Sequence, residues 1–209
     1  MRIRKSAETR KAEIVDATLR LADKLGPDRL TTETIAEAVG LSQPGIFRHF
    51  PKKQDLWEEV AARVGSMMEA GWKKAQGGDA TSTVRIHMLI GAQLRLIQST
   101  PAISSILFSR ELHTKNKGLR AAFFALMSRF HKLIAGHVAQ ACAAGELRDD
   151  LDPDDAAFLI IGLVQGLAVR WSLSGRSFDL TEEGNRLLDL QLMGLASGSS
   201  GANKERSAS

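Results

Sequence analysis

The chain has 209 residues, enough for one domain or two small ones, and a formal net charge of +4. With 44% hydrophobic residues it can bury a core, and 25% charged residues fit a soluble protein. The single cysteine, Cys142, excludes an internal disulfide and indicates a reducing compartment. No run approaches the roughly 18 apolar residues of a transmembrane helix, and no signal-peptide pattern opens the chain. We therefore expect a cytoplasmic protein that does not contact a membrane.

Almost every segment has helical periodicity and none has convincing strand alternation, which predicts an all-α fold. The nine expected helices are 6–25, 31–39, 43–50, 52–75, 81–99, 102–113, 119–144, 153–173 and 179–196. A polar hinge is expected at 114–118. Asp152 and Asp179 are expected to N-cap the last two helices. The expected domains are 1–55 and 56–196, with a small, polar and disordered tail at 197–209.

The second and third helices are short and are separated by a tight turn. Thr31 or Thr32 can N-cap the first of them, and Gly40 lies where the chain must leave it. The next helix then starts at Ser42 or Gln43. Two short helices joined in this way are the layout of a helix-turn-helix motif, whose second helix enters the major groove of DNA.

The third helix has a distinct inner and outer side. Ile46 and Phe50, four residues apart, are expected to point inward. The outward positions are Gln43, Gly45, Arg48 and His49. Polar outward residues on such a helix can reach the edges of base pairs.

This segment resembles the DNA-binding region of the TetR family of one-component bacterial repressors. The matching positions are, in order, Thr31, Ile35-Ala36, Gly40-Leu41-Ser42, Phe47-Arg48-His49-Phe50 and Lys53. The family usually has Tyr where this chain has Phe47, and the chain contains no Tyr. Phe47 keeps the ring but loses a phosphate hydrogen bond worth roughly 0.5–1.5 kcal/mol. The resemblance is strong over 8–57 and architectural beyond, and it implies three DNA-binding helices followed by six helices for ligand binding and dimerisation.

The resemblance and the residue chemistry together assign contacts to double-stranded DNA. Gln43 suits adenine and Arg48 suits guanine, while His49 and Lys53 are expected to hold phosphate. An alternative role for His49 is to cap the end of its helix. The expected DNA-binding residues are Thr31, Thr32, Ser42, Gln43, Pro44, Gly45, Phe47, Arg48, His49 and Lys53.

A basic arm precedes the motif. The first eleven residues carry one acidic residue, Glu8, against five basic residues, which are Arg2, Arg4, Lys5, Arg10 and Lys11. Such an arm can lie along phosphates or reach into the minor groove. The alternative interpretation is a solvated terminus.

The helix at 153–173 is apolar around nearly its whole circumference, so it must be buried on all sides. Gly162 and Gly166 would also permit close approach of another backbone. We therefore expect a two-fold homodimer with a four-helix interface, the alternative being a monomer with unusually deep helices. The expected interface residues are Phe158, Ile161, Gly162, Gln165, Gly166, Val169, Leu188, Leu192 and Leu195. A dimer predicts a palindromic operator.

Several Met, aromatic and polar residues at helical spacing could line a cavity, although such residues are more often plain core. In the TetR family this region commonly holds an effector pocket. The candidate residues are Met68, Trp72, Met88, Arg95, Phe108, His113, Phe123, Met127 and His131. They would suit an apolar or amphipathic effector.

No catalytic, phosphate-loop or dinucleotide motif is present, and the histidines form no ligand cluster with Cys142. We therefore expect neither an enzyme nor a cofactor or metal site. The sequence predicts a homodimeric repressor that an effector releases from DNA. Two alternatives are an effector-independent DNA-binding factor of the nucleoid-associated or division-control type, and a ligand-binding module that has lost DNA recognition through Phe47.

Overall fold

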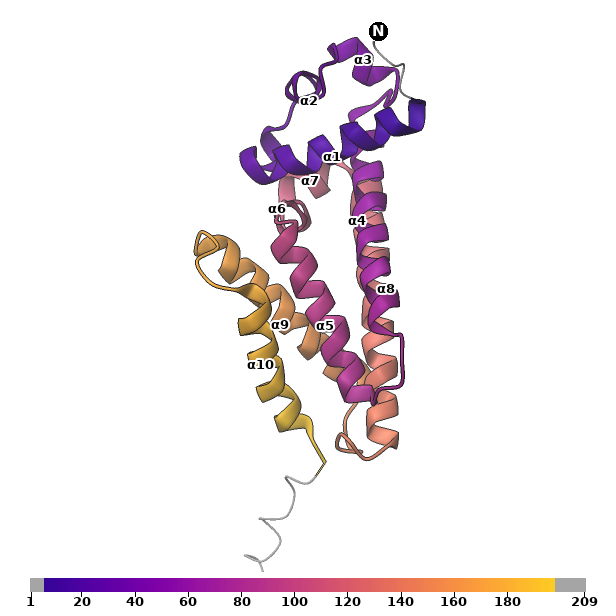
Figure 1. The fold of residues 1–209 in the computed structure, drawn as a ribbon, viewed down its shortest axis with the longest axis vertical. Coiled ribbons are helices and arrows are strands. Elements are labelled where there is room, and N and C mark those ends of the chain that lie inside the picture. Colours follow the sequence, from indigo (N-terminus) through magenta and orange to yellow (C-terminus); the bar gives the residue numbers. More distant parts are fainter. Residues whose placement is uncertain (1–5, 198–209) are drawn as a thin grey trace, which may run out of the picture. The chain divides into compact units, whose positions relative to one another are not determined.

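A computed structural model describes residues 6–197, and over this range the fold is helical (Figure 1). Its elements are α1 Ala7–Leu25, η1 Pro27–Arg29, α2 Thr32–Ala38, α3 Gln43–Phe47, α4 Lys53–Ala75, α5 Ser82–Ser99, α6 Ala102–Leu107, α7 Arg110–Lys115, α8 Lys117–Ala143, α9 Pro153–Leu173 and α10 Leu180–Leu195. The all-α prediction is confirmed. The described residues form two compact units, 6–69 with Ser99–Leu126, and Ala70–Gln98 with 127–197. Whether function divides near residue 55 stays a prediction.

The segment predicted as one helix over 102–113 is two helices, so the predicted count of nine was wrong. The break falls at Ser109, whose hydroxyl accepts a hydrogen bond from the Leu112 N–H at 3.0 Å and begins α7. The predicted hinge at 114–118 also shrinks to one residue, Asn116, between α7 and α8. The Asn116 side chain donates to the Leu112 carbonyl at 2.8 Å and so closes the end of α7. Apolar periodicity alone could not locate this break.

The first unit is built around α1, which contacts α2, η1 and α6. Ile14 of α1, Ile35 of α2 and Ile46 of α3 are each at most 1% exposed. Ser6 N-caps α1 by accepting from the Thr9 N–H at 3.1 Å, and Gly26 leaves the helix at a φ of 82°. The buried side of α1 therefore forms the core of this unit together with the buried residues of α2 and α3.

In the second unit, α9 and α10 run side by side (Figure 1). Asp152 and Asp179 N-cap them as predicted. Helices α5 and α10 of this unit also pack closely. A Cβ added to Gly184 of α10 would lie 2.4 Å from Leu94 Cδ1 of α5. Leu94 and Leu188 are both fully buried, so the core of this unit includes α5 and α10.

Helix α9 corrects the prediction that no run approaches the length of a membrane span. Pro153–Leu173 has a mean hydropathy of 1.7 and is long and apolar enough to cross a membrane by length and composition. A core helix of a soluble protein passes the same test, and 44% of the tested window is buried in the fold. One such helix is weak support for a membrane role.

The described C-terminus is paired with the loop that follows α8. Leu147 and Ala196 form an isolated antiparallel bridge, and the Arg148 N–H donates to the Leu195 carbonyl at 3.0 Å. The Ser197 N–H donates to the Glu146 carbonyl at 3.3 Å, so Ser197, which the sequence placed in a tail, is bonded to the fold. Predictions for 198–209, and for Arg2, Arg4 and Lys5, lie outside the described residues.

Glu146 caps α5 from this loop and yields a testable pH dependence. Its carboxylate accepts from the N–H groups of Ser82 at 3.3 Å and Thr83 at 3.1 Å, and from the Thr83 hydroxyl. Burial alone would raise the Glu146 pKa, but these hydrogen bonds outweigh it and lower the pKa. A depressed carboxyl pKa adds stability above its unfolded value of about 4.3 and loses it as pH falls further.

We expect Glu146→Ala to reduce the free energy of unfolding at pH 7 by about 1–2 kcal/mol, because α5 loses its cap. The difference from the parent protein should shrink below about pH 4. Urea denaturation at both pH values measures it, with Glu59→Ala on exposed α4 surface as the control. An equal loss at both pH values would assign the effect to packing instead of the ionised carboxylate.

Candidate DNA-binding interface

The turn between α2 and α3 is set by local hydrogen bonds. The Thr31 hydroxyl caps α2 by accepting from the Thr34 N–H at 3.1 Å, and Gly40 adopts a φ of 65° as the chain leaves that helix. The Ser42 hydroxyl caps α3 by accepting from the Gly45 N–H at 3.3 Å, and Pro44 sits in the first turn. These contacts make Thr31 the N-cap of α2 and Ser42 the N-cap of α3, whose first helical residue is Gln43. They fix the angle at which α3 leaves the turn.

Helix α3 is anchored from one side only. Ile46 is 1% exposed and Phe50 is 4% exposed, which confirms that both point inward. Gln43, Pro44 and Arg48 are exposed. The motif therefore presents the polar and small residues of α3 to solvent on a rigid base.

The structure adds a positioning contact that the sequence did not reveal. The Gln43 side-chain amide donates to the Thr32 hydroxyl at 2.8 Å, across the turn between the two helices. The amide group keeps a second N–H and its oxygen, the pair of groups that suits adenine. Thr32 was predicted to contact DNA, and in the fold its side chain also orients Gln43. Only the bend of the turn brings these two residues together.

Phe47 lies at the surface with 41% of its area exposed. A phenylalanine that served the core would be buried like Phe50. The ring is therefore exposed to solvent, as Gln43 and Arg48 are, and His49 beside it is half-buried.

Lys53 is more constrained than an extended phosphate-binding lysine. Its ammonium donates to the Leu30 carbonyl, which directly precedes the N-cap of α2. Burial, followed by the nearby Lys115, lowers the Lys53 pKa. The ammonium keeps two further N–H groups beside a helix N-terminus, where an anion is favoured.

Part of the basic arm is also engaged with the fold. The Arg10 guanidinium pairs with Glu13 at 2.9 Å, and the Lys11 ammonium lies 5.9 Å from the centre of the Phe50 ring. The Arg10 side chain is therefore held along α1, and the Lys11 side chain is held over Phe50.

Comparison with known proteins agrees with this geometry. Residues 14–60 match the family model for bacterial regulatory proteins of the tetR family, and residues 107–181 match the tetracyclin repressor-like C-terminal domain. The chain belongs to the TetR family of transcriptional regulators. It is therefore a DNA-binding regulator of transcription. Family membership confirms the resemblance that the motif indicated.

Three relatives show how far the likeness to other TetR-family proteins extends. The HTH-type transcriptional regulator TtgR of Pseudomonas putida is 28% identical over 91% of this chain and 93% of its own length. The nucleoid occlusion factor SlmA of Aliivibrio fischeri is 24% identical over 84% of this chain and 90% of its own. The crystal structure of the Bacillus subtilis regulator FadR in complex with stearoyl-CoA superposes with a TM-score of 0.75, at 20% identity, covering 88% and 98% of the two chains.

The dimer face predicted for this TetR-family chain is only partly outward. Phe158 and Val169 are 65% and 39% exposed, and Gly162 and Gly166 have open space where a Cβ would be. Gln165 and Leu195 are half-buried. Three of the predicted residues are at most 7% exposed in the single chain, namely Ile161, Leu188 and Leu192, and their place in an interface stays a prediction. Four further apolar residues of α9 and α10 are exposed in the single chain, namely Leu159, Leu173, Leu190 and Met193.

The predicted effector residues fall into three groups. Met68, Trp72 and Phe123 are buried, and His113, Met127 and His131 are half-buried. Trp72 stacks on Phe130 with ring centres 4.9 Å apart. Met88, Arg95 and Phe108 have exposed side chains, which argues against these three as walls of an enclosed cavity.

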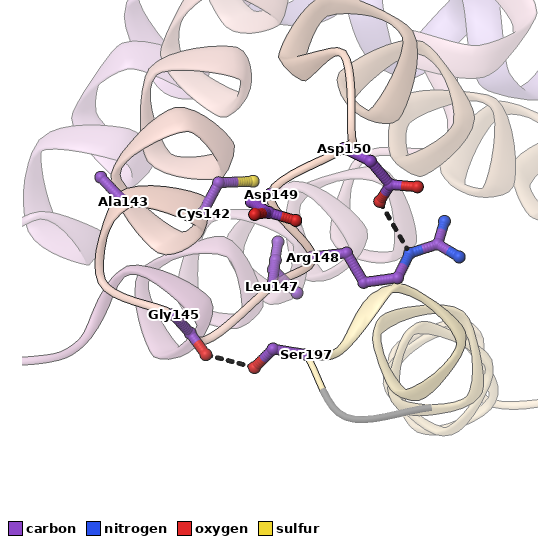
Figure 2. Close-up of a pocket in the computed structure, with 8 residues that line it drawn as sticks. All are labelled: Cys142, Ala143, Gly145, Leu147, Arg148, Asp149, Asp150 and Ser197. Carbon is purple, nitrogen blue, oxygen red and sulfur yellow. Dashed lines mark hydrogen bonds and ion pairs between the residues drawn. The ribbon is translucent and has the colours of Figure 1, made fainter. Parts of the chain in front are cut away.

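A separate hollow of about 530 Å³ lies at the end of α8 (Figure 2). Cys142, Arg148 and Asp150 line it, and Arg148 Nε lies 3.5 Å from Asp150 Oδ1. Burial, with Asp149 nearby, raises the Cys142 pKa, which favours the protonated thiol. The predicted effector residues are not among those lining this hollow. Over residues 6–197 no three His, Cys, Asp or Glu side chains gather as a metal site.

Proposed function

We propose that this protein is a homodimeric repressor in the cytoplasm that binds a palindromic operator and leaves it when a small effector binds. The observation that carries the DNA-binding part is the exposed face of α3, on which Thr32 orients Gln43 at 2.8 Å. Arg48 is exposed at the end of the same helix. A helix with these two residues outward can read adenine and guanine edges in the major groove.

The dimer is supported by the apolar outer side of α9. Phe158, Leu159 and Leu173 are 60–84% exposed in the single chain. Exposing this apolar surface to water is unfavourable, and a second copy packed on it would remove that exposure. One α3 reads only a few base pairs, so two copies related by a two-fold axis are needed for a specific site. The operator should then be an imperfect palindrome.

An effector is supported by the relative that was crystallised with stearoyl-CoA. We propose an apolar or amphipathic effector here as well. Its binding would shift α6 and α7, tilt α4 and separate the two recognition helices. The effector must bind the DNA-incompetent state more tightly, because otherwise no population shifts. Thermal shift against a panel of acyl and aromatic compounds would find it through a raised melting temperature.

The likeness to nucleoid occlusion factors favours a second candidate, DNA binding without an effector. That candidate predicts no stabilising ligand and unchanged operator affinity across the panel. A module that has lost DNA recognition is the third possibility, motivated by Phe47. The exposed position of Phe47 fits a surface ring at the DNA interface and so favours the first two.

Sequence-selected DNA enrichment tests the proposal directly. We expect a palindrome to be recovered and Arg48→Ala to bind it roughly 5- to 150-fold more weakly, since one good base pairing is worth about 1–3 kcal/mol. If no palindrome is enriched, or if Arg48→Ala binds the operator as tightly as the parent protein does, the repressor proposal is wrong.

Lys53 and Gln43 should separate two kinds of DNA contact. Lys53→Ala is expected to weaken operator and random DNA alike and to reduce the slope of log affinity against log salt by about 1. Gln43→Ala is expected to weaken the operator by about 1–3 kcal/mol and random DNA little. Fluorescence anisotropy at four salt concentrations measures both. Equal losses on both DNAs for both variants would refute these roles.

A further inference from the structure

A second small pocket lies within the first unit, between η1, the start of α4 and α7. It has a volume of about 230 Å³, and Lys53 is among the residues that line it. Its walls include Asp28, Lys53, Trp57, Glu111, Leu112 and Lys115. The pocket therefore combines an indole, a leucine and four charged groups.

Two of the residues that line this pocket carry a side-chain hydrogen-bond donor that the fold does not fully use. Trp57 is 0% exposed, and its indole N–H finds no hydrogen-bond acceptor in residues 6–197. The other two indoles are satisfied, Trp72 by the Gln93 side chain at 3.3 Å and Trp171 by the Phe178 carbonyl at 3.0 Å. The Lys53 ammonium donates one N–H to the Leu30 carbonyl and has two further N–H groups. A buried donor without an acceptor is rare in native folds and marks a place for a ligand or water.

The acidic groups of the pocket already have partners. The Asp28 carboxylate accepts from the Ser109 hydroxyl at 2.6 Å, and the Glu111 carboxylate accepts from the Lys115 ammonium. Burial and Lys115 outweigh Asp28 and lower the Lys53 pKa. The Lys53 ammonium is thus the group whose charge is least compensated.

We propose that this pocket binds a small organic carboxylate, with one oxygen on the Trp57 indole N–H and the other on the Lys53 ammonium. Leu112 and Pro27, which also lines the pocket, would cover its short apolar part. A single negative charge is favoured, because Asp28 and Glu111 repel a phosphate dianion. The volume limits the ligand to an acid of a few carbon atoms.

Such a ligand would compete with DNA for Lys53. This consequence rests on the proposed function, in which Lys53 holds a DNA phosphate. A carboxylate bound at Lys53 removes one phosphate contact in each half-site, so ligand and operator weaken each other's binding equally. The carboxylate site itself requires no DNA, so it can be tested in the DNA-free protein.

The three tryptophans give a direct test in the intact DNA-free protein. We expect sodium propionate to move the Trp57 indole N–H signal downfield in a ¹⁵N–¹H spectrum, saturably, and to leave the Trp72 and Trp171 signals in place. Trp72→Phe and Trp171→Phe assign the signals. In Lys53→Met the midpoint of the titration should rise about tenfold, the loss of one charge-assisted bond. A Trp57 signal that stays still, or responds equally to chloride or propionamide, would overturn the proposal.

A DNA titration then tests the competition separately. At equal ionic strength, propionate should raise the operator Kd by about tenfold relative to chloride, and this difference should vanish in Lys53→Met. A saturable Trp57 shift with no change in operator Kd would retain the site and overturn the competition. If enrichment returns no palindrome, the proposed function fails while the spectrum still decides the carboxylate site.

Discussion

Val169→Glu on α9 is expected to convert the proposed dimer to monomers and to weaken operator binding by about 100-fold or more. Val169 is 39% exposed on a helix where Gly162 and Gly166 leave open space. If a second copy fills that space, the new carboxylate is buried without a partner, which costs several kcal/mol. A monomer also loses the gain in effective concentration that linked half-sites provide. Light scattering after gel filtration and anisotropy on the enriched operator measure the two effects.

Val84→Glu is the matched control for this change. Val84 is 47% exposed on α5, outside the proposed interface, so the same substitution should leave the dimer and its DNA affinity unchanged. Circular dichroism must show that Val169→Glu remains helical. A helical Val169→Glu protein that stays dimeric and binds normally would place the interface elsewhere.

Local chemistry made much of the fold predictable from sequence. Asp152 and Asp179 were placed as N-caps because short acidic side chains can accept from the free N–H groups of a helix start. Gly40 was placed at the helix exit because the turn needs a positive φ. In both cases the physical constraint lies within four residues of the position that satisfies it.

The predictions that were wrong or incomplete concern features that the residue pattern alone does not determine. The division of 102–113 into α6 and α7 rests on Ser109, which could equally have sat inside one helix. Helix α10 offers leucine on several sides, so periodicity could not tell that Leu188 is buried while Leu190 is 54% exposed. The bond from Gln43 to Thr32 and the pocket at Trp57 join residues that only the folded chain brings together.

Trp72→Ala is expected to reduce the free energy of unfolding by about 3–5 kcal/mol. Trp72 is 6% exposed, its ring stacks on Phe130 at 4.9 Å, and its indole N–H donates to the Gln93 side chain at 3.3 Å. The change removes the ring from the core and leaves the buried Gln93 oxygen without a donor. Urea denaturation followed by circular dichroism measures the loss. Val84→Ala, at an exposed position of the same unit, should change stability by less than about 0.5 kcal/mol.

The size of this loss also decides what Trp72 is for. A ring packed on all sides leaves a cavity when it is removed, and the full cost appears. A ring that forms one wall of an effector pocket has no packing partners on its open side, so its removal should cost much less. Trp72→Phe sharpens the comparison, because it retains a ring against Phe130 while losing the bond to Gln93. A loss near 1 kcal/mol in Trp72→Ala would contradict the core role, and the effector search should then begin at Trp72.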